Sequence, residues 1–256
     1  MTKIDVLTLF PEMMEAVLGE SIIGRARNKG LININCTNIR DFTKMKHGHV
    51  DDGAYGGGRG MVMAVQPVLS ALESVKRDDI KPFVIYMSPQ GKVFNQEIAK
   101  ELLLKDHLVF LCGHYEGIDE RIIENAVDME LSIGDYVLTG GEIPAMAVID
   151  AVCRMVKGVL PDEEAFTEES HFNGLLEYPQ YTRPEEIFGE KVPEILLSGH
   201  HKKIENWRRR QSLYRTWKKR PDMLKTAHLT KSDREYLEKY KGKRRKTAKF
   251  IDEEIK

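Results

Sequence analysis

The sequence lacks the long apolar runs, paired cysteines and strong net charge that would assign it to a specialised class of protein. No uninterrupted apolar run approaches the roughly 20 residues needed to span a bilayer. The first residues lead into a predicted strand and contain no apolar core of a signal peptide. Cys36, Cys112 and Cys153 form no metal-spaced pair and imply no disulfides. We therefore expect a cytoplasmic protein.

The remaining composition is that of a soluble globular protein. The chain has 256 residues, of which 41% are hydrophobic and 31% charged, enough for one large domain and a smaller one. A net charge of −1 conceals an asymmetry, because basic residues gather in the last quarter of the chain.

Strand, loop and helix alternate three times between residues 83 and 156, which predicts an α/β fold with a parallel sheet. The predicted strands are 3–10, 31–38, 83–87, 108–112 and 129–133. The predicted helices are 13–18, 21–29, 67–76, 95–104, 119–126 and 144–156. An acidic stretch follows, which we expect to be a poorly ordered linker, giving domains at 1–160 and 176–256 with the linker at 161–175.

Three glycine-containing loops, at residues 88–91, 112–117 and 134–141, each follow one of these strands. Glycine lets the backbone approach a ligand closely, although tight turns use it as well. For any one loop a tight turn explains the glycines better. Three such loops at the ends of successive strands favour a ligand crevice at one edge of the sheet.

Residues 40–60 show no regular period and contain the run Tyr55-Gly56-Gly57-Gly58. The run lacks the Lys-Ser/Thr of a phosphate-binding P-loop and does not lead from a strand into a helix. A glycine-rich turn and a flexible substrate loop fit it equally well. We interpret His47 and His49 as surface residues, because two histidines without a third ligand are a weak metal signal.

The last quarter is predicted to be a small, all-helical domain. A helix at 198–220 carries Ile204, Trp207, Tyr214 and Trp217 on one face, and Ser232 with Glu235 has the spacing of a capping box for a last helix. That helix contains nine Lys or Arg residues and one acidic residue, and residues 241–249 are again rich in Lys and Arg. A basic helix can be merely solvated, but both features beside two tryptophans favour nucleic acid.

Several short motifs are distributed along nearly the whole chain, and their order and spacing are distinctive. They are Asp51-Asp52, Tyr55-Gly56-Gly57-Gly58, Gly60-Met61-Val62-Met63, Ser88-Pro89-Gln90-Gly91, Cys112-Gly113-His114-Tyr115-Glu116-Gly117, Ser132-Ile133-Gly134-Asp135-Tyr136-Val137-Leu138-Thr139-Gly140-Gly141-Glu142, Gly174-Leu175-Leu176 and Tyr181-Thr182-Arg183-Pro184. In these motifs the sequence resembles the bacterial tRNA (guanine-N1)-methyltransferases, the TrmD family of knotted, SPOUT-class enzymes.

The resemblance implies a deep trefoil knot built from the three loops, in a domain that binds S-adenosylmethionine. It also implies a homodimer whose active site combines the knot of one chain with the linker of the other, methylation at N1 of the guanine at tRNA position 37, and assistance by magnesium, for which the sequence offers no clear ligand set. The implied donor-binding residues are Tyr86, Met87, Ser88, Pro89, Gln90, Gly113, Tyr115, Glu116, Gly117, Ile133, Gly134, Asp135, Tyr136, Val137, Leu138, Gly140, Gly141 and Pro144.

The family's general base, an Asp in the linker, corresponds here to Glu169, with Glu168 as the alternative. Arg154 matches the family's essential arginine, which would stabilise charge on the guanine oxygen, although an arginine there could also complement the helix dipole. Glu for Asp at 169 and Ala54 for the usual Pro are departures from the family pattern. The residues expected to contact RNA are Ser170, Arg183, Arg208, Arg209, Arg215 and Lys218.

Three other functions fit parts of the sequence. A knotted methyltransferase acting on ribosomal RNA or on another tRNA position would share the fold and donor. A non-catalytic RNA-binding protein would bind tRNA without transferring a methyl group. A Rossmann-type oxidoreductase fits the alternation but lacks the dinucleotide fingerprint, so it ranks last.

Overall fold

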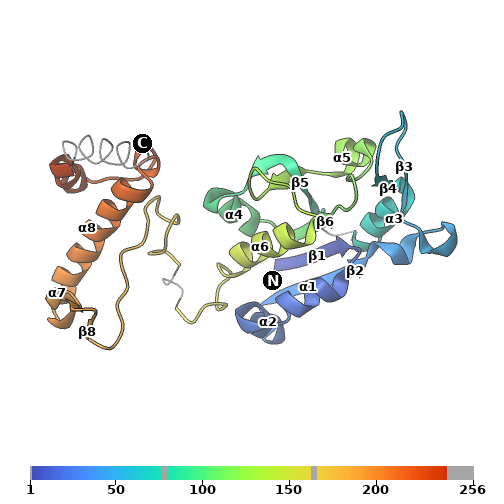
Figure 1. Cartoon of the computed structure of the whole chain (residues 1–256). Helices are drawn as coiled ribbons and strands as arrows, with labels where there is room; N and C mark the ends of the chain where they lie inside the picture. The colour runs from blue at the N-terminus through green and yellow to red at the C-terminus, as the bar shows by residue number, and fades with distance from the viewer. Residues whose placement is uncertain (1, 77–79, 163–165, 241–256) are drawn as a thin grey trace. The chain divides into compact units, whose positions relative to one another are not determined.

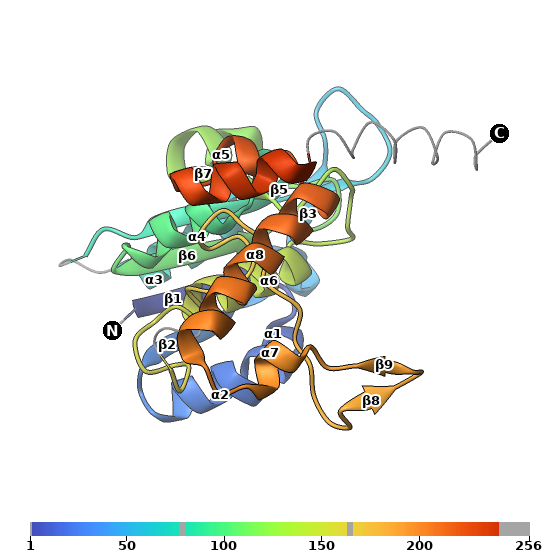
Figure 2. The same ribbon diagram turned by 90° about the vertical axis from the view of Figure 1, so that its left-hand side faces the viewer.

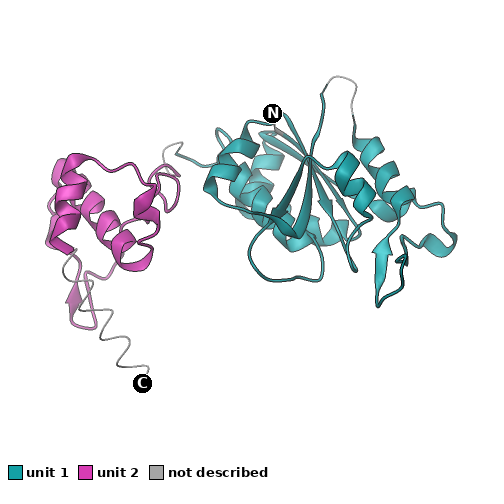
Figure 3. Cartoon of the chain, turned by 90° about the horizontal axis from the view of Figure 1, so that it is seen from above, with its two compact units in different colours: residues 1–163 teal, residues 164–256 magenta. Residues whose placement is uncertain are grey.

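The computed structural model describes residues 2–76, 80–162 and 166–240 of the chain. The chain divides into two compact units, residues 1–163 and 164–256 (Figure 3). The division places most of the acidic stretch 161–175 in the second unit. The basic stretch 241–249 lies outside the described residues.

Unit 1 is built on a five-stranded sheet with strand order β2-β1-β6-β5-β7, and each pair of neighbours is parallel. The strands are β1 (Thr2–Thr8), β2 (Ile32–Asn38), β5 (Phe83–Val93), β6 (His107–Cys112) and β7 (Met129–Ser132). All six residues of β6 are buried, as expected for a central strand that is covered on both faces. The predicted parallel α/β architecture is confirmed.

Helices cover both faces of this sheet. On one face α6 contacts α1 and α4, and the three helices lie in a row (Figure 1). On the other face, residues of α3 and α5 pack in one cluster with Leu7, Val109 and Leu111 of the sheet. The helices of unit 1 are α1 (Pro11–Leu18), α2 (Ser21–Asn28), α3 (Val65–Val75), α4 (Gln96–Leu103), α5 (Glu120–Ala126) and α6 (Glu142–Cys153).

Two local features of unit 1 differ from the sequence prediction. β5 continues past residue 87, because Met87 and Lys92 both pair with Leu131 and the residues between them bulge out of the strand. Residues 40–60 contain the 3₁₀ turns η1 (Ile39–Phe42) and η2 (Lys46–Gly48), and an antiparallel hairpin joins β3 (Asp51–Gly53) to β4 (Met61–Met63). The glycine-rich run forms the tip of that hairpin.

Unit 2 contains α7 (Glu194–Leu197), α8 (His201–Lys219), the 3₁₀ turn η3 (Met223–Lys225) and helical residues 231–240. The prediction that this unit is all-helical is wrong. β8 (Glu186–Ile187) and β9 (Glu190–Lys191) form a two-stranded hairpin that projects from it (Figure 2). The hairpin turns through Phe188 and Gly189, both with positive φ, which is the backbone of a tight hairpin turn.

The core of unit 2 is small. Leu175, Leu213 and Leu237 form its buried centre, and Trp217 and Tyr236 pack against it. Ser212, Leu213 and Thr216 are therefore the buried residues of α8, whereas Ile204, Trp207 and Tyr214 of the predicted face are only half-buried. The buried face of α8 is rotated from the predicted one because it includes a serine and a threonine, which a pattern of large apolar side chains does not indicate.

Candidate functional site

One cleft of about 310 Å³ lies at the carboxyl ends of β5, β6 and β7. The three loops predicted to meet at this edge all contribute to it. Of the implied donor-binding residues, the structure brings sixteen together in its lining and leaves out Gly134 and Asp135. The lining residues are Tyr86, Met87, Ser88, Pro89, Gln90, Gly113, His114, Tyr115, Glu116, Gly117, Ile118, Glu120, Ile123, Glu130, Leu131, Ser132, Ile133, Tyr136, Val137, Leu138, Thr139, Gly140, Gly141 and Pro144.

Glycines hold the three loops closer together than side chains would allow. The Gly141 N–H donates to the Gly113 carbonyl at 2.9 Å. A Cβ on Gly141 would lie 2.7 Å from the Cα of Cys112, and one on Gly113 would lie 2.8 Å from the Tyr86 hydroxyl. A Cβ on Gly91 would overlap the backbone of β7. These glycines are therefore required by close packing rather than by turn geometry.

A buried carboxylate lies beneath the third loop. Glu142, at the first position of α6, is 3% exposed, and the Thr8 hydroxyl donates to its Oε1 at 2.7 Å. A Cβ on Gly140 would overlap Oε2 of Glu142. The carboxylate thus links the end of β1 to the 139–141 segment, and its position at a helix N-terminus is electrostatically favourable. No local sequence pattern indicates this pair, whose members are 134 residues apart.

Two other groups near the cleft are kept protonated. Burial raises the pKa of Tyr86, and a backbone hydrogen bond at Ile118 opposes this rise. Burial, followed by the nearby Glu142, raises the pKa of Cys112 well above its usual range. Because nucleophilic chemistry needs the thiolate, Cys112 serves as a packing residue here.

The glycine-rich hairpin is attached to the second loop of the cleft. The Met63 N–H donates to the Gly117 carbonyl at 2.9 Å, and the Glu116 N–H donates to the Met61 carbonyl at 3.0 Å. At the hairpin tip, Tyr55 is fully exposed. The backbone of the hairpin is therefore continuous with the cleft wall, which the sequence did not indicate.

The charge of the cleft is negative. Its lining contains the carboxylates of Glu116, Glu120 and Glu130, and no Lys or Arg is among the lining residues. The lining also contains other residues that were not implied to bind the donor: Ile118, Ile123 and Leu131 are apolar, whereas His114, Ser132 and Thr139 are polar. A cationic or neutral ligand suits this lining better than one that carries phosphates.

Arg154 lies outside this lining, at the C-terminal cap of α6. Pro144, which does line the cleft, is ten residues earlier, so the helix separates the two by about 15 Å along its axis. Arg154 is half-buried, and its backbone N–H donates to the Asp150 carbonyl at 3.0 Å. Within one chain the arginine and the cleft are thus at opposite ends of one helix.

Glu168 and Glu169 belong to unit 2, in a folded loop rather than a poorly ordered linker. The His171 N–H donates to the Leu175 carbonyl at 2.8 Å, and the Glu177 N–H donates to the Ser170 hydroxyl at 2.9 Å. The Glu168 carboxylate is exposed and accepts a hydrogen bond from the Tyr178 hydroxyl at 3.2 Å, whereas Glu169 is half-buried. The two adjacent carboxylates therefore have different surroundings.

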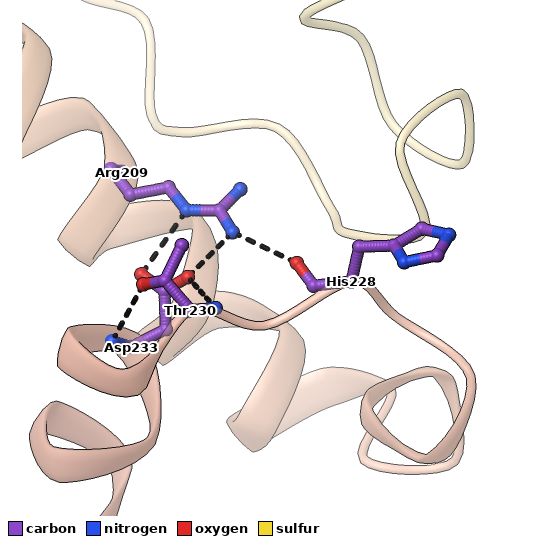
Figure 4. Close-up of polar contacts among 4 residues, drawn as sticks. All are labelled: Arg209, His228, Thr230 and Asp233. Atoms are coloured by element: carbon purple, nitrogen blue, oxygen red, sulfur yellow. Dashed lines mark hydrogen bonds and ion pairs between the residues drawn. The ribbon is translucent and has the colours of Figure 1, made fainter.

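Three of the six residues expected to contact RNA have partners inside unit 2. Besides Ser170, the Arg208 guanidinium lies 4.7 Å from the centre of the Tyr178 ring. Arg209 forms two hydrogen bonds with Asp233, the shorter at 2.8 Å (Figure 4). Arg183 and Lys218 are exposed, and Arg215 is half-buried.

Asp233 also caps the helical residues 231–240. Its carboxylate accepts from the Thr230 N–H at 2.9 Å, and its own N–H donates to the Thr230 hydroxyl at 3.2 Å (Figure 4). The predicted capping box of Ser232 with Glu235 is thus wrong by two residues. Burial alone would raise the pKa of Asp233, but the hydrogen bonds from Arg209 and Thr230 outweigh it and the pKa is lowered.

Within residues 2–76, 80–162 and 166–240, no three His, Cys, Asp or Glu side chains are grouped so that they could hold a metal ion. Among the same residues, none of the helices has the length and apolar character that crossing a membrane requires.

Comparison with known proteins places these features in context. Residues 2–226 match the family described as tRNA (Guanine-1)-methyltransferase TrmD. The chain is 63% identical to a tRNA (guanine-N(1)-)-methyltransferase of Ruminiclostridium cellulolyticum over 87% of this chain and 96% of that protein. It is 56% identical to the Clostridium beijerinckii protein of the same name, over 94% of this chain and 100% of that protein. For the Staphylococcus epidermidis protein of that name the identity is 54%, over 94% and 98%.

Proposed function

The chain belongs to the tRNA (guanine-1)-methyltransferase family TrmD, and from that premise we propose that it methylates N1 of the guanine at position 37 of tRNA. S-adenosylmethionine is the proposed donor, because a methyltransferase of this family implies it. The observation that carries the proposal is the cleft at the carboxyl edge of the sheet, lined by three loops and by carboxylates without Lys or Arg.

The residues of the cleft fit this donor on two grounds. S-adenosylmethionine carries a sulfonium and an ammonium group, and Glu116, Glu120 and Glu130 give the lining a complementary charge. The close approach of Gly113 and Gly141 leaves backbone groups, rather than side chains, at the inner wall. A dinucleotide would instead need cationic or hydrogen-bond-donating groups to bind its phosphates, and this argues against the oxidoreductase alternative.

The protein's own task is to move one proton and to balance one charge. When bound, S-adenosylmethionine supplies a methyl group that its sulfonium already activates. Glu169 takes the proton from N1 of the guanine, and Arg154 stabilises the negative charge that develops on the neighbouring carbonyl oxygen. Glu168 is the alternative base, one residue before the position that matches the family's Asp, and its carboxylate accepts a hydrogen bond from Tyr178. A magnesium requirement stays a prediction.

We propose a homodimer with shared active sites, as the resemblance to the family implies. The cleft is in unit 1 and Glu169 is in unit 2, and we propose that the carboxylate comes from the second subunit. Met13 and Val17 of α1 and Ile143 of α6 support a dimer contact, since these apolar side chains are 41%, 54% and 48% exposed on helices that pack together.

The family's trefoil knot and its tRNA contacts complete the proposal. The bridge between His114 and Gly140 holds the third loop against the second, as a knot made from these loops would require. In unit 2 we propose that Arg183, Arg215 and Lys218 bind phosphates of the anticodon arm, so that tRNA affinity falls with salt. The target guanine would have to leave its stack to reach the donor.

The test uses labelled S-adenosylmethionine and tRNA transcripts that differ only at nucleotides 36 and 37. The proposal predicts label at N1 of guanine 37 and none when adenine replaces it. Label at another tRNA position or in ribosomal RNA would identify a different knotted methyltransferase. Binding of tRNA without transfer of label would identify a non-catalytic RNA-binding protein.

A further inference from the structure

The loop at residues 166–177 is fixed to the core of unit 2 by its backbone. The Leu176 N–H donates to the Thr216 hydroxyl at 2.8 Å, and this hydroxyl donates in turn to the Ser212 carbonyl at 2.7 Å. Thr216 is fully buried, and Leu175 packs on Leu213 in the small core. The end of the loop that follows the two glutamates is therefore held firmly.

The glutamate end of the loop is held by a side chain. The Tyr178 hydroxyl reaches back ten residues to the Glu168 carboxylate, at 3.2 Å. The Arg208 guanidinium covers the tyrosine ring at 4.7 Å, an arrangement in which cation and ring attract each other. Burial raises the pKa of Tyr178 although Arg208 lowers it, so the hydroxyl remains protonated and can donate at neutral pH.

We propose that Tyr178, stacked under Arg208, is a positioning residue for the general base. It holds the Glu168 carboxylate, and in this way fixes the orientation of the peptide that carries Glu169. The inference rests on the proposed function, in which Glu169 is the base. It assigns Arg208 to the support of this loop instead of to a phosphate of the RNA.

Without this contact, the exposed Glu168 carboxylate would be able to turn toward the substrate and compete with Glu169. A carboxylate engaged by a hydroxyl donor has one fewer orientation available. Misplacing a catalytic group by about 1 Å can cost on the order of 100-fold in rate. The hydrogen bond from Tyr178 to Glu168 is therefore expected to affect turnover more than it affects binding.

The experiment measures kcat and KM of the full-length chain for both substrates in matched variants. Tyr178→Phe keeps the ring and its stacking on Arg208 but removes the hydroxyl, and we expect kcat to fall about 10-fold with both KM values unchanged. Glu168→Leu should show the same fall. Glu168→Gln keeps an oxygen that can accept from the hydroxyl, and it should retain most of the activity.

The double variant Tyr178→Phe with Glu168→Leu separates positioning from general destabilisation. If the hydroxyl acts through Glu168, the double variant is no slower than either single variant. The proposal would be overturned if the fold-loss in kcat of the double variant equalled the product of the two single losses. A Glu168→Leu variant with wild-type kcat would also overturn it. Since Glu168 is exposed, Glu168→Leu can be interpreted even if Tyr178→Phe unfolds.

Two further variants locate any failure. Arg208→Lys keeps the charge but loses the planar stack, so it should lower kcat and leave the KM for tRNA unchanged. A raised KM with normal kcat would show that Arg208 binds RNA and would overturn its assignment.

Glu169→Gln should lose about 10²- to 10⁴-fold in kcat. Wild-type turnover in that variant would overturn the proposed base and this inference with it. An inactive Glu169→Gln beside a fully active Tyr178→Phe would overturn the positioning role alone.

Discussion

The two units of this chain hold their candidate catalytic parts in different ways. In unit 1 the cleft is formed by backbone, because glycines such as Gly113 and Gly141 bring three loops together over a sheet whose central strand β6 is fully buried. In unit 2 the core is small, and polar side chains such as Thr216 and Asp233 hold the loops in place. Activity should therefore be sensitive to atoms added at the glycines of the cleft, and to hydrogen bonds lost in unit 2, which carries the proposed base.

Apart from Glu169→Gln, the largest expected effect comes from Arg154, which lies at the end of α6 away from the cleft. Arg154→Ala should lower kcat by about 10²- to 10³-fold or more, because it removes the charge proposed to face the developing oxyanion. Affinity for S-adenosylmethionine, measured by calorimetry, should stay unchanged. Arg154→Lys keeps the charge without the planar pair of donors and should recover part of the loss. Normal turnover in Arg154→Ala would leave the arginine with its helix-capping role.

Gly141→Ala tests whether the cleft depends on backbone packing. The new methyl group would press on Cys112, which is fully buried. Overpacking of this kind costs about 1–3 kcal/mol, so we expect the Kd for S-adenosylmethionine to rise about 10-fold or more. Gly53→Ala is the matched control, because a Cβ there meets no atom within 4 Å and φ is not positive. Equal Kd values for the two variants would contradict the role assigned to the glycines.

Asp233→Asn gives the smallest effect and tests the polar support of unit 2. It weakens the contact with Arg209 and the cap at Thr230, and we expect a loss of about 1–2 kcal/mol in the free energy of unfolding. Because the pKa of Asp233 is lowered in the folded state, its contribution is present above its unfolded pKa of about 3.9 and is lost as the pH falls through the folded pKa. Thermal unfolding of wild type and variant should thus differ at pH 7 and converge in acid.

The sequence predicted unit 1 better than unit 2 for a physical reason. Buried parallel strands are continuous apolar runs, so their order and the glycine-containing loops after them could be recognised locally. The bulge at residues 88–91 and the buried pair of Thr8 with Glu142 depend on contacts between distant segments, and no local pattern indicates them. In unit 2 Thr230 with Asp233 has the same local spacing as Ser232 with Glu235, so spacing alone did not distinguish the two capping boxes. The contact of Asp233 with Arg209, 24 residues away, is visible only in the fold.

The same limit applies to the candidate site. The sequence motifs correctly identified most of the residues that line the cleft. However, two of the residues expected to contact RNA, Arg208 and Arg209, have partners within the fold. A basic residue on a helix has the same local pattern whether it faces a phosphate or a tyrosine ring. Its partner decides its role, and that partner is known only from the fold.

Mixed dimers test most directly the claim that the cleft of one chain works with Glu169 of the other. Gly141→Ala and Glu169→Gln chains, each with its own affinity tag, would be co-expressed, and the doubly tagged dimer assayed for methyl transfer at low donor concentration. The account predicts about half of wild-type activity, because one of the two sites then combines an intact cleft with an intact Glu169. A mixed dimer no more active than the two parent variants would contradict it, since each chain would then need its own cleft and its own carboxylate.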